Sequence, residues 1–234
     1  MRIGIICAGD KELAPFLPMI DGCRITEKAM LQFHEGRISG IDIVALYSGV
    51  CKVNAAIATQ ILIDTYDVDA VINAGTAGGM DNQLGIFDSV ISTEAAYHDV
   101  APDILTEFHP WLDTVFFKAN EKLIKLSRQA VKRVITEGNV YWGRMVTGEA
   151  FITDKGRQRI NEQFASLTVD METASIAHVC YVNNIPFISV RSITDTATHS
   201  GASHFEENCQ KASAIVRDIT VALLAELYEQ TNAW

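Results

Sequence analysis

Short apolar runs alternate along the chain with longer segments in which apolar residues recur every three or four positions. The short runs are rich in β-branched residues and predict strands over residues 2–7, 69–73, 89–95, 140–146 and 187–193. The longer segments predict helices over residues 52–65, 121–134, 173–182 and 209–228. This alternation indicates an α/β fold around a mixed sheet.

Further features of the N-terminal part refine this picture. Apolar runs over residues 30–35 and 41–48 flank the segment 36–40, which predicts a hairpin connection. Pro15 and Pro18 lie where a helix is expected after the first strand, so that helix must start late or be broken. No segment has the composition of a linker, and residues 1–234 are therefore predicted to form a single domain.

The segments that directly follow the predicted strands are rich in Gly, Ser, Thr and carboxylate side chains. In an open α/β sheet, ligands bind outside the carboxyl ends of the strands. We therefore expect one pocket to be formed by residues 9–12, 48–52, 75–79, 147–152 and 194–196.

The composition makes several classes of partner improbable. The 234 residues include 19 Lys and Arg against 29 Asp and Glu, a net charge of -10. Such a surface repels phosphate backbones and anionic lipid, so neither nucleic acid nor a membrane is an expected partner. No apolar run has the length of a signal-peptide core or a membrane span. The five cysteines are scattered without a C-x-x-C pair, which is typical of reduced thiols and predicts a cytoplasmic protein.

The glycine-rich segment 75–79 is the first candidate for chemistry. Its sequence, Gly-Thr-Ala-Gly-Gly, predicts a turn in which backbone N–H groups approach a ligand closely. A tight connection between a strand and a helix explains the segment equally well. It fits neither the G-x-G-x-x-G dinucleotide fingerprint nor the G-x-x-x-x-G-K-[ST] phosphate loop, so NAD-binding and ATPase functions are not favoured.

Carboxylates near the ends of predicted strands are the second signal, and each has a plainer explanation. Asp195 follows the strand over residues 187–193, where an Asp is as often a helix N-cap as a catalyst. Glu172 begins an apolar helix, where the helix dipole favours a solvated carboxylate. A position on the surface explains Glu12 equally well. His98 and Asp99 could form a base and its orienting carboxylate, although such a pair is more often structural.

Metal-dependent and nucleophilic chemistry have little support. His199, His204 and Cys209 lack the spacing of metal ligands, so no metal site is expected. A Ser or Cys nucleophile with a His partner stays open, but the chain contains no G-x-S-x-G elbow.

Seven motifs in order along the chain point to one family. They are residues 2–6 with Glu12, 48–53, Asn-Ala-Gly-Thr-Ala-Gly-Gly over 73–79, Tyr-His-Asp over 97–99, Gly-Glu-Ala-Phe-Ile over 148–152, Asp-Met-Glu over 170–172 and 190–195. With this set, the chain resembles the 5'-methylthioadenosine/S-adenosylhomocysteine nucleosidases of the nucleoside phosphorylase superfamily. The resemblance extends from the first residues to Phe205.

The resemblance implies a fold, a reaction and a partner. The expected fold is a three-layer α/β/α domain with a central mixed, partly barrel-like sheet, and the expected assembly is a homodimer. The implied reaction hydrolyses the N-glycosidic bond of an adenine nucleoside, releasing adenine and a 5-thio-substituted ribose, as in methionine salvage. No metal or organic cofactor is implied.

The resemblance also implies roles for the carboxylates. Cleavage builds positive charge on the sugar and negative charge on the base, so an acid, a base and a sugar-binding anion are needed. By resemblance, Asp195 donates a proton to N7 of adenine, and Glu12 activates the attacking water with help from Arg191. Glu172 is expected to accept hydrogen bonds from the ribose hydroxyls. An Asp acting as an acid must have its pKa raised by burial or hydrogen bonding.

The remaining implied contacts surround the base and the sugar. Phe151 is expected to stack on adenine while the Ile152 backbone reads the edge of the base. Met171 is expected to pack under the ribose. The other implied contacts are the Ala77 and Gly78 backbone along the base and ribose, the Thr194 hydroxyl beside Asp195, and Phe205 covering the site.

The chain departs from the family pattern at three places. Asp170 replaces the first Glu of a Glu-Met-Glu motif and is one methylene shorter. Gly9 stands where family members often carry Met, which would open space near the attacking water. Residues 100–117 match poorly, although this region of the family helps to form the pocket for the 5'-alkylthio group. Ile104, Leu105 and Phe108 are apolar candidates there, together with Pro110.

Alternative functions follow from the same residues. A purine nucleoside phosphorylase would need arginines in the glycine turns to bind phosphate, and none is present there, while Glu12 would repel the anion. A hydrolase of aminodeoxyfutalosine or 5'-deoxyadenosine would use the same base and ribose contacts. A non-catalytic nucleoside-binding protein is a minor alternative, because Glu12 and Asp195 are both retained.

Overall fold

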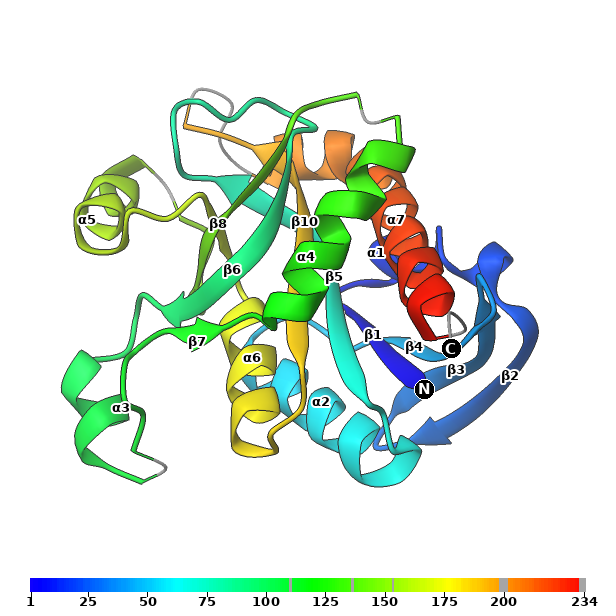
Figure 1. Cartoon of the computed structure of the whole chain (residues 1–234). Coiled ribbons are helices and arrows are strands. Elements are labelled where there is room, and N and C mark those ends of the chain that lie inside the picture. The colour runs from blue at the N-terminus through cyan, green and yellow to red at the C-terminus, as the bar shows by residue number, and fades with distance from the viewer. Residues whose placement is uncertain (110, 136, 153, 198–201, 232–234) are drawn as a thin grey trace.

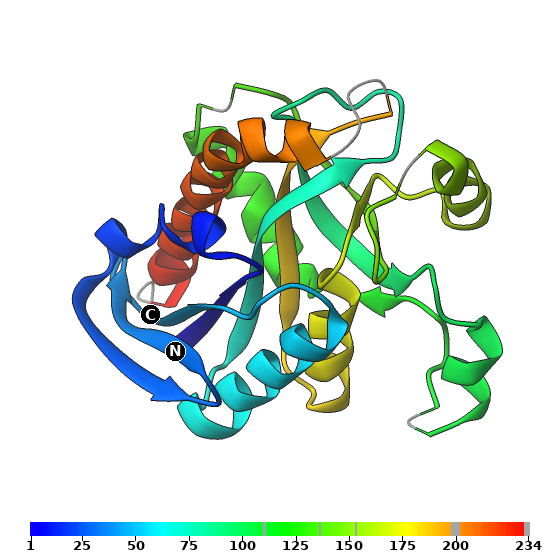
Figure 2. The ribbon, with the colours of Figure 1, turned by 180° about the vertical axis from the view of Figure 1, so that it is seen from behind.

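The computed structural model describes residues 1–109, 111–135, 137–152, 154–197 and 202–231. In these residues a ten-stranded sheet has helices packed on both faces (Figures 1 and 2). The strands are β1 (Arg2–Cys7), β2 (Asp21–Lys28), β3 (Leu31–Ile38), β4 (Ile41–Tyr47), β5 (Ala70–Gly79), β6 (Ser89–Tyr97), β7 (Phe117–Lys118), β8 (Val140–Thr147), β9 (Thr168–Asp170) and β10 (Phe187–Asp195). The helices are α1 (Asp10–Leu13), α2 (Lys52–Tyr66), α3 (Pro102–Glu107), α4 (Glu121–Ala130), α5 (Asp154–Phe164), α6 (Thr173–Val182) and α7 (Ala202–Thr231), with 3-10 turns over Leu17–Met19 and Val131–Arg133.

Part of the sheet closes into a five-stranded barrel. β5 pairs in parallel with β10, which pairs antiparallel with β6. β6 and β8 are parallel, β8 and β9 are parallel, and β9 returns antiparallel to β5. From β5 the sheet continues through β1, β4, β3 and β2, while β7 pairs with β6. The expected mixed, partly barrel-like sheet is therefore confirmed.

The two helical layers follow from the alternation of side chains along the strands. Ile3 and Ile5 of β1 belong to a core cluster that includes Ile219 of α7. Ile6 belongs to a second cluster on the other face of the sheet, which includes Leu62 of α2. Helices α4 and α7 thus cover one face and α2 and α6 the other, which is the expected three-layer α/β/α arrangement (Figure 1).

The predicted turn over residues 75–79 is wrong, because this segment is the end of β5. Strand β10 pairs with it residue by residue, with Arg191 opposite Gly75 and Ile193 opposite Ala77. All ten residues of β5 are buried. The glycines therefore serve close packing inside the barrel, where a Cβ at Gly75 would lie 2.6 Å from Glu12 Oε1.

Other boundaries differ for simple physical reasons. Helix α1 begins directly after β1 and ends at Leu13, so the expected break before Pro15 is confirmed while a late start is not. The predicted hairpin is present, but its turn is confined to Ser39 and Gly40, both with positive φ. Sequence patterns did not predict β2, β7, α3, α5 or β9; β2 is exposed along most of its length. Within the part of the chain that the structure describes, no helix could span a membrane.

Candidate active site

The carboxyl ends of six strands, β1, β4, β5, β8, β9 and β10, meet at a cavity of about 340 Å³. Its wall is formed by residues 8–12, Val50, 76–78, 150–152, 169–172, 194–195, Phe205 and Cys209. All five segments that the sequence expects to converge contribute to this wall. The wall also includes Glu12, Asp195, Ala77, Gly78, Phe151, Ile152, Met171, Glu172, Thr194 and Phe205, which are the predicted site residues other than Arg191.

Glu12 is buried in α1 and held by a dense set of donors. Its Oε2 accepts hydrogen bonds from the Ala8 and Gly9 N–H groups at 2.8 and 3.1 Å. Its Oε1 accepts from the Thr76 N–H at 2.7 Å and from the Thr76 hydroxyl at 2.8 Å. Each carboxylate oxygen therefore has two donors, and the Thr76 hydroxyl is the only one of the four that can rotate away.

Asp195 lies at the end of β10 and is 6% exposed. Its Oδ1 accepts a hydrogen bond from the Thr194 hydroxyl at 3.0 Å, as the sequence predicts for a hydroxyl beside this residue. Burial raises the pKa of the Asp195 carboxyl, outweighing the opposite effects of the Thr194 hydroxyl, Arg157 and His204. Helix α7 begins only at Ala202, so Asp195 is not a helix cap.

Glu172 is the N-cap residue of α6 and is 4% exposed, so it is not a solvated carboxylate. The Cys51 N–H donates to its Oε1 at 3.0 Å, and Arg191 Nη2 lies 3.6 Å from its Oε2. Burial raises the pKa of Glu172 to about 7, aided by the negative charges of Asp170 and Glu12 and opposed by Arg191.

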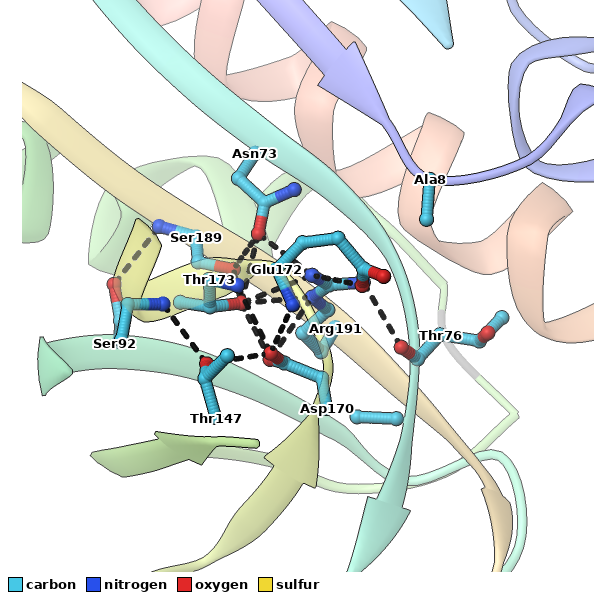
Figure 3. A network of polar contacts seen from close by, with 12 residues as sticks. Ala8, Asn73, Thr76, Ser92, Thr147, Asp170, Glu172, Thr173, Ser189 and Arg191 are labelled. Carbon is cyan, nitrogen blue, oxygen red and sulfur yellow. Dashed lines mark hydrogen bonds and ion pairs between the residues drawn. The ribbon is translucent and has the colours of Figure 1, made fainter. Parts of the chain in front are cut away.

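Arg191, which the resemblance assigns to help Glu12 activate the attacking water, is not among the residues that line the cavity. It is fully buried on β10 and donates to Asn73 Oδ1 at 2.8 Å, to the Thr173 hydroxyl at 2.9 Å and to the Thr76 carbonyl at 3.0 Å. Figure 3 shows its guanidinium group among polar side chains of neighbouring strands and of α6. Buried charges must be paired, and these contacts direct the guanidinium group toward carboxylates from behind the cavity wall.

Asp170 occupies the shortened position of the Asp-Met-Glu motif and still has a full set of partners. Its Oδ1 accepts from the Thr147 hydroxyl at 2.7 Å and from the backbone N–H groups of Glu172 and Thr173 at 3.0 and 2.9 Å. Its Oδ2 lies 3.5 Å from Arg191 Nε. The shorter side chain thus connects strand β8, the start of α6 and the buried arginine (Figure 3).

An apolar edge borders the polar part of the cavity. The rings of Phe151 and Phe205 meet edge to face with 6.0 Å between their centroids. Phe151 is 56% exposed, so part of its side chain is open to a ligand. Sequence reasoning missed Val50, Thr76 and Cys209; the first two lie within predicted strand exits, whereas no pattern pointed to Cys209.

Two other predicted features lie outside the cavity wall. Asp99 pairs with Lys52 at 2.9 Å rather than with His98. Residues 100–109 and 111–117 do not line the cavity, and Pro110 lies outside the described residues. No set of three or more His, Cys, Asp or Glu side chains suited to a metal occurs in the described ranges; His199 is outside them.

Comparisons with known proteins agree with this geometry. The model of the phosphorylase superfamily matches residues 2–225. A 5'-methylthioadenosine/S-adenosylhomocysteine nucleosidase of Bacillus cytotoxicus is 34% identical over 236 residues, covering 97% of this chain and all of the relative.

Solved structures give the same result. A nucleosidase of this type from Colwellia psychrerythraea in complex with adenine has a TM-score of 0.89 and 32% identity, covering 97% of this chain and 96% of its own. The enzyme from Neisseria meningitidis in complex with methylthio-immucillin-A has a TM-score of 0.88 and 27% identity, covering 96% and 98%. On the family model and the Bacillus relative together, this chain belongs to the phosphorylase superfamily and, within it, to the 5'-methylthioadenosine/S-adenosylhomocysteine nucleosidases.

Proposed function

We propose that this protein hydrolyses the N-glycosidic bond of 5'-methylthioadenosine and S-adenosylhomocysteine, releasing adenine and the 5-thio-substituted ribose. The observation that carries the proposal is that Glu12, Glu172 and Asp195, from three separate elements, line one cavity. The likeness to nucleosidases over 97% of the chain supports the same reaction.

The chemistry divides among the three carboxylates. Asp195, with its raised pKa, holds the proton that adenine takes up as the bond between C1' and N9 breaks. Glu172 accepts hydrogen bonds from the ribose hydroxyls and faces the cationic sugar with negative charge. Glu12 takes a proton from the water that attacks C1'. The Thr76 hydroxyl must first rotate away, because it occupies the last acceptor position of Glu12 Oε1.

The charge of the cavity wall favours water over phosphate as the nucleophile. No arginine is among the described residues of the wall. Its basic side chain, Lys11, lies 3.7 Å from the carboxylate of Glu206. A phosphate ion would therefore enter next to Glu12 and Glu172 without a guanidinium partner, at a high electrostatic cost.

Product analysis tests the reaction. Purified protein is incubated with each nucleoside in phosphate-free buffer and again with phosphate. We expect adenine and free thioribose in equal amounts in both buffers. Ribose 1-phosphate formed only with phosphate would instead identify a phosphorylase, and binding without turnover would identify a nucleoside-binding protein.

Glu12→Gln tests the base. In either orientation, the NH₂ group of the glutamine would replace a carboxylate oxygen that accepts from two donors. The substituted side chain therefore loses acceptor capacity as well as charge. We expect hydrolysis to fall by about 100-fold or more while adenine binding persists. Near-normal turnover would remove Glu12 from this role.

We further propose that the chain acts as a homodimer. Apolar side chains are exposed on α2 and its start (Val50, Val53 and Ile57), at the end of α6 (Tyr181 and Val182) and around α3 (Ile104, Phe108 and Trp111). Figures 1 and 2 place these three helices at the same end of the molecule. An exposed apolar surface of this kind is typical of an interface. Sedimentation of the protein and of Val53→Glu tests it, since the charge should shift a dimer toward monomer.

The location and organisation of the chain are also proposals. All five cysteines are free thiols, which suits the reducing cytoplasm. The described strands belong to one sheet, which supports a single domain over residues 1–234.

A further inference from the structure

The Tyr-His-Asp motif over residues 97–99 is not used by the proposed mechanism, yet its last member is tightly bound. Lys52 Nζ donates to both carboxylate oxygens of Asp99, at 2.9 and 3.0 Å. The backbone N–H of Glu149 donates to Asp99 Oδ2 at 3.0 Å. The Glu149 carboxylate in turn accepts from the Lys52 N–H at 3.0 Å and lies 3.9 Å from Lys52 Nζ. These contacts form a closed ring of Lys52, Asp99 and Glu149, here called the clamp.

The clamp lies at the start of α2, where the backbone also binds Glu172 of the cavity wall. Cys51, the N-cap residue, provides no side-chain cap, and the first turn of α2 contains no acidic residue. Two carboxylates from elsewhere take its first donors instead: Glu172 binds the Cys51 N–H and Glu149 binds the Lys52 N–H. Glu172 belongs to the sugar side, and Glu149 directly precedes residues 150–152, which line the cavity. The N–H groups of two consecutive residues, Cys51 and Lys52, therefore fix the Glu172 and Glu149 carboxylates relative to each other.

Tyr97 and His98, the other two residues of the motif, pack next to the clamp and its loop. Lys52 Nζ lies 5.3 Å from the centroid of the Tyr97 ring, which favours its position over Asp99. The His98 ring fills the space beside Gly148, so that a Cβ at Gly148 would overlap His98 Nε2. The loop that carries residues 150–152 therefore leaves β8 at Gly148, which packs against His98. The next residue, Glu149, donates its backbone N–H to Asp99.

We propose that Asp99 is a positioning residue that fixes the loop 148–152 for binding of the adenine base. The inference rests on the proposed function for the identity of the ligand. Asp99, Lys52 and Glu149 do not line the cavity, so they act through residues 150–152 rather than on the reacting atoms. Their side chains are 28%, 21% and 44% exposed, so water partly screens the charges of this group.

Steady-state kinetics and adenine binding of Asp99→Ala and Lys52→Met test the proposal. Without the clamp, the loop must be ordered on binding, so we expect KM and the Kd for adenine to rise about tenfold, the factor that corresponds to one charge-assisted hydrogen bond. We expect kcat to stay within about threefold, because Glu12, Glu172 and Asp195 keep their own contacts. Lys52→Arg should restore most of the affinity.

Glu94→Ala is a matched control. It removes an ion pair of similar exposure and geometry, Arg144–Glu94 at 2.7 Å, which also links β6 to β8 but does not involve the cavity wall. We expect it to lower stability without changing KM or adenine affinity. If Asp99→Ala behaves as this control does, or lowers kcat with KM unchanged, the proposal is overturned.

Hydrogen exchange of the ligand-free protein separates this inference from the proposed function. The amide of Glu149 is held by Asp99, so exchange over residues 148–152 should be faster in Asp99→Ala than in the unchanged protein and in Glu94→Ala. Equal exchange in all three would overturn the proposal even if the nucleosidase activity is present. If exchange is faster in Asp99→Ala but the unchanged protein cleaves neither nucleoside, the role of Asp99 in fixing the loop stands and only adenine as the ligand is rejected.

Discussion

Replacing Cys51 with glycine tests whether the backbone at the start of α2 is strained. Cys51 has φ 81° and ψ 163°, a conformation that essentially only glycine adopts without steric cost. In this conformation its N–H is directed at Glu172 Oε1, 3.0 Å away. Strain at this point would therefore hold a donor on a carboxylate of the cavity. We expect Cys51→Gly to stabilise the fold while keeping that hydrogen bond.

The size of the effect follows from two opposing contributions. A non-glycine residue in this region costs on the order of 1–3 kcal/mol. Glycine gives the unfolded chain extra freedom, which costs the folded state roughly 0.5–1 kcal/mol. The difference is a net stabilisation of about 1 kcal/mol. The thiol is only partly buried, so its removal changes this balance little.

Urea unfolding at a single protein concentration measures the difference. With a slope of about 1–3 kcal/mol per molar urea, the midpoint of Cys51→Gly should rise by about 0.3–1 M. Cys51→Ala is the control, because it removes the thiol but keeps the Cβ, and its stability should stay within about 0.5 kcal/mol of the unchanged protein. If Cys51→Gly is no more stable than Cys51→Ala, the backbone at this position is not strained.

Four further substitutions probe the carboxylates and their surroundings. Asp195→Asn should lower kcat by about 100- to 10,000-fold, as expected for loss of a general acid, with adenine affinity measured by calorimetry nearly unchanged. Gly75→Ala would place a Cβ 2.6 Å from Glu12 Oε1 and should abolish hydrolysis and lower the free energy of unfolding by about 2 kcal/mol or more. Gly9→Ala, whose Cβ would meet nothing within 4 Å, should leave the free energy of unfolding within about 0.5 kcal/mol. Because burial raises the pKa of Glu172 from 4.5 to about 7, the folded state binds the proton more tightly than the unfolded state does. Stability should therefore fall by up to about 3 kcal/mol as pH rises across that interval, and urea unfolding of Glu172→Gln should lack this part of the fall.

The fold was largely predictable because its main elements have strong periodic patterns. Helix α6 and strand β1 have the predicted boundaries, since each is a mostly apolar segment with clear ends. The segment 75–79 was misread, because glycines that admit a neighbouring strand look in sequence like glycines that make a turn. Strand β2 was missed because its residues are exposed and carry no alternation.

The candidate site could be predicted only in part. Local patterns leave Glu12, Glu172 and Asp195 ambiguous, and the resemblance to a family joined them into one pocket. The position of Arg191 behind the wall could not be read from sequence, because it depends on which partners meet a side chain at the centre of the barrel. Asp99 is comparable: its partners Lys52 and Glu149 lie about 50 positions away on either side in sequence.

The charge balance around Arg191 links the fold to the choice of nucleophile. This guanidinium lies within 3.6 Å of both Asp170 and Glu172, and the charge of Glu12 also acts on it, so the group has more acidic than basic side chains. Raising the pKa of Glu172 relieves only part of that excess. A phosphate ion entering the cavity would meet the remaining negative charge, whereas the guanidinium lies behind the wall and is already engaged by these carboxylates. Water carries no charge into this field, so placing the arginine in the core rather than on the wall favours hydrolysis over phosphorolysis.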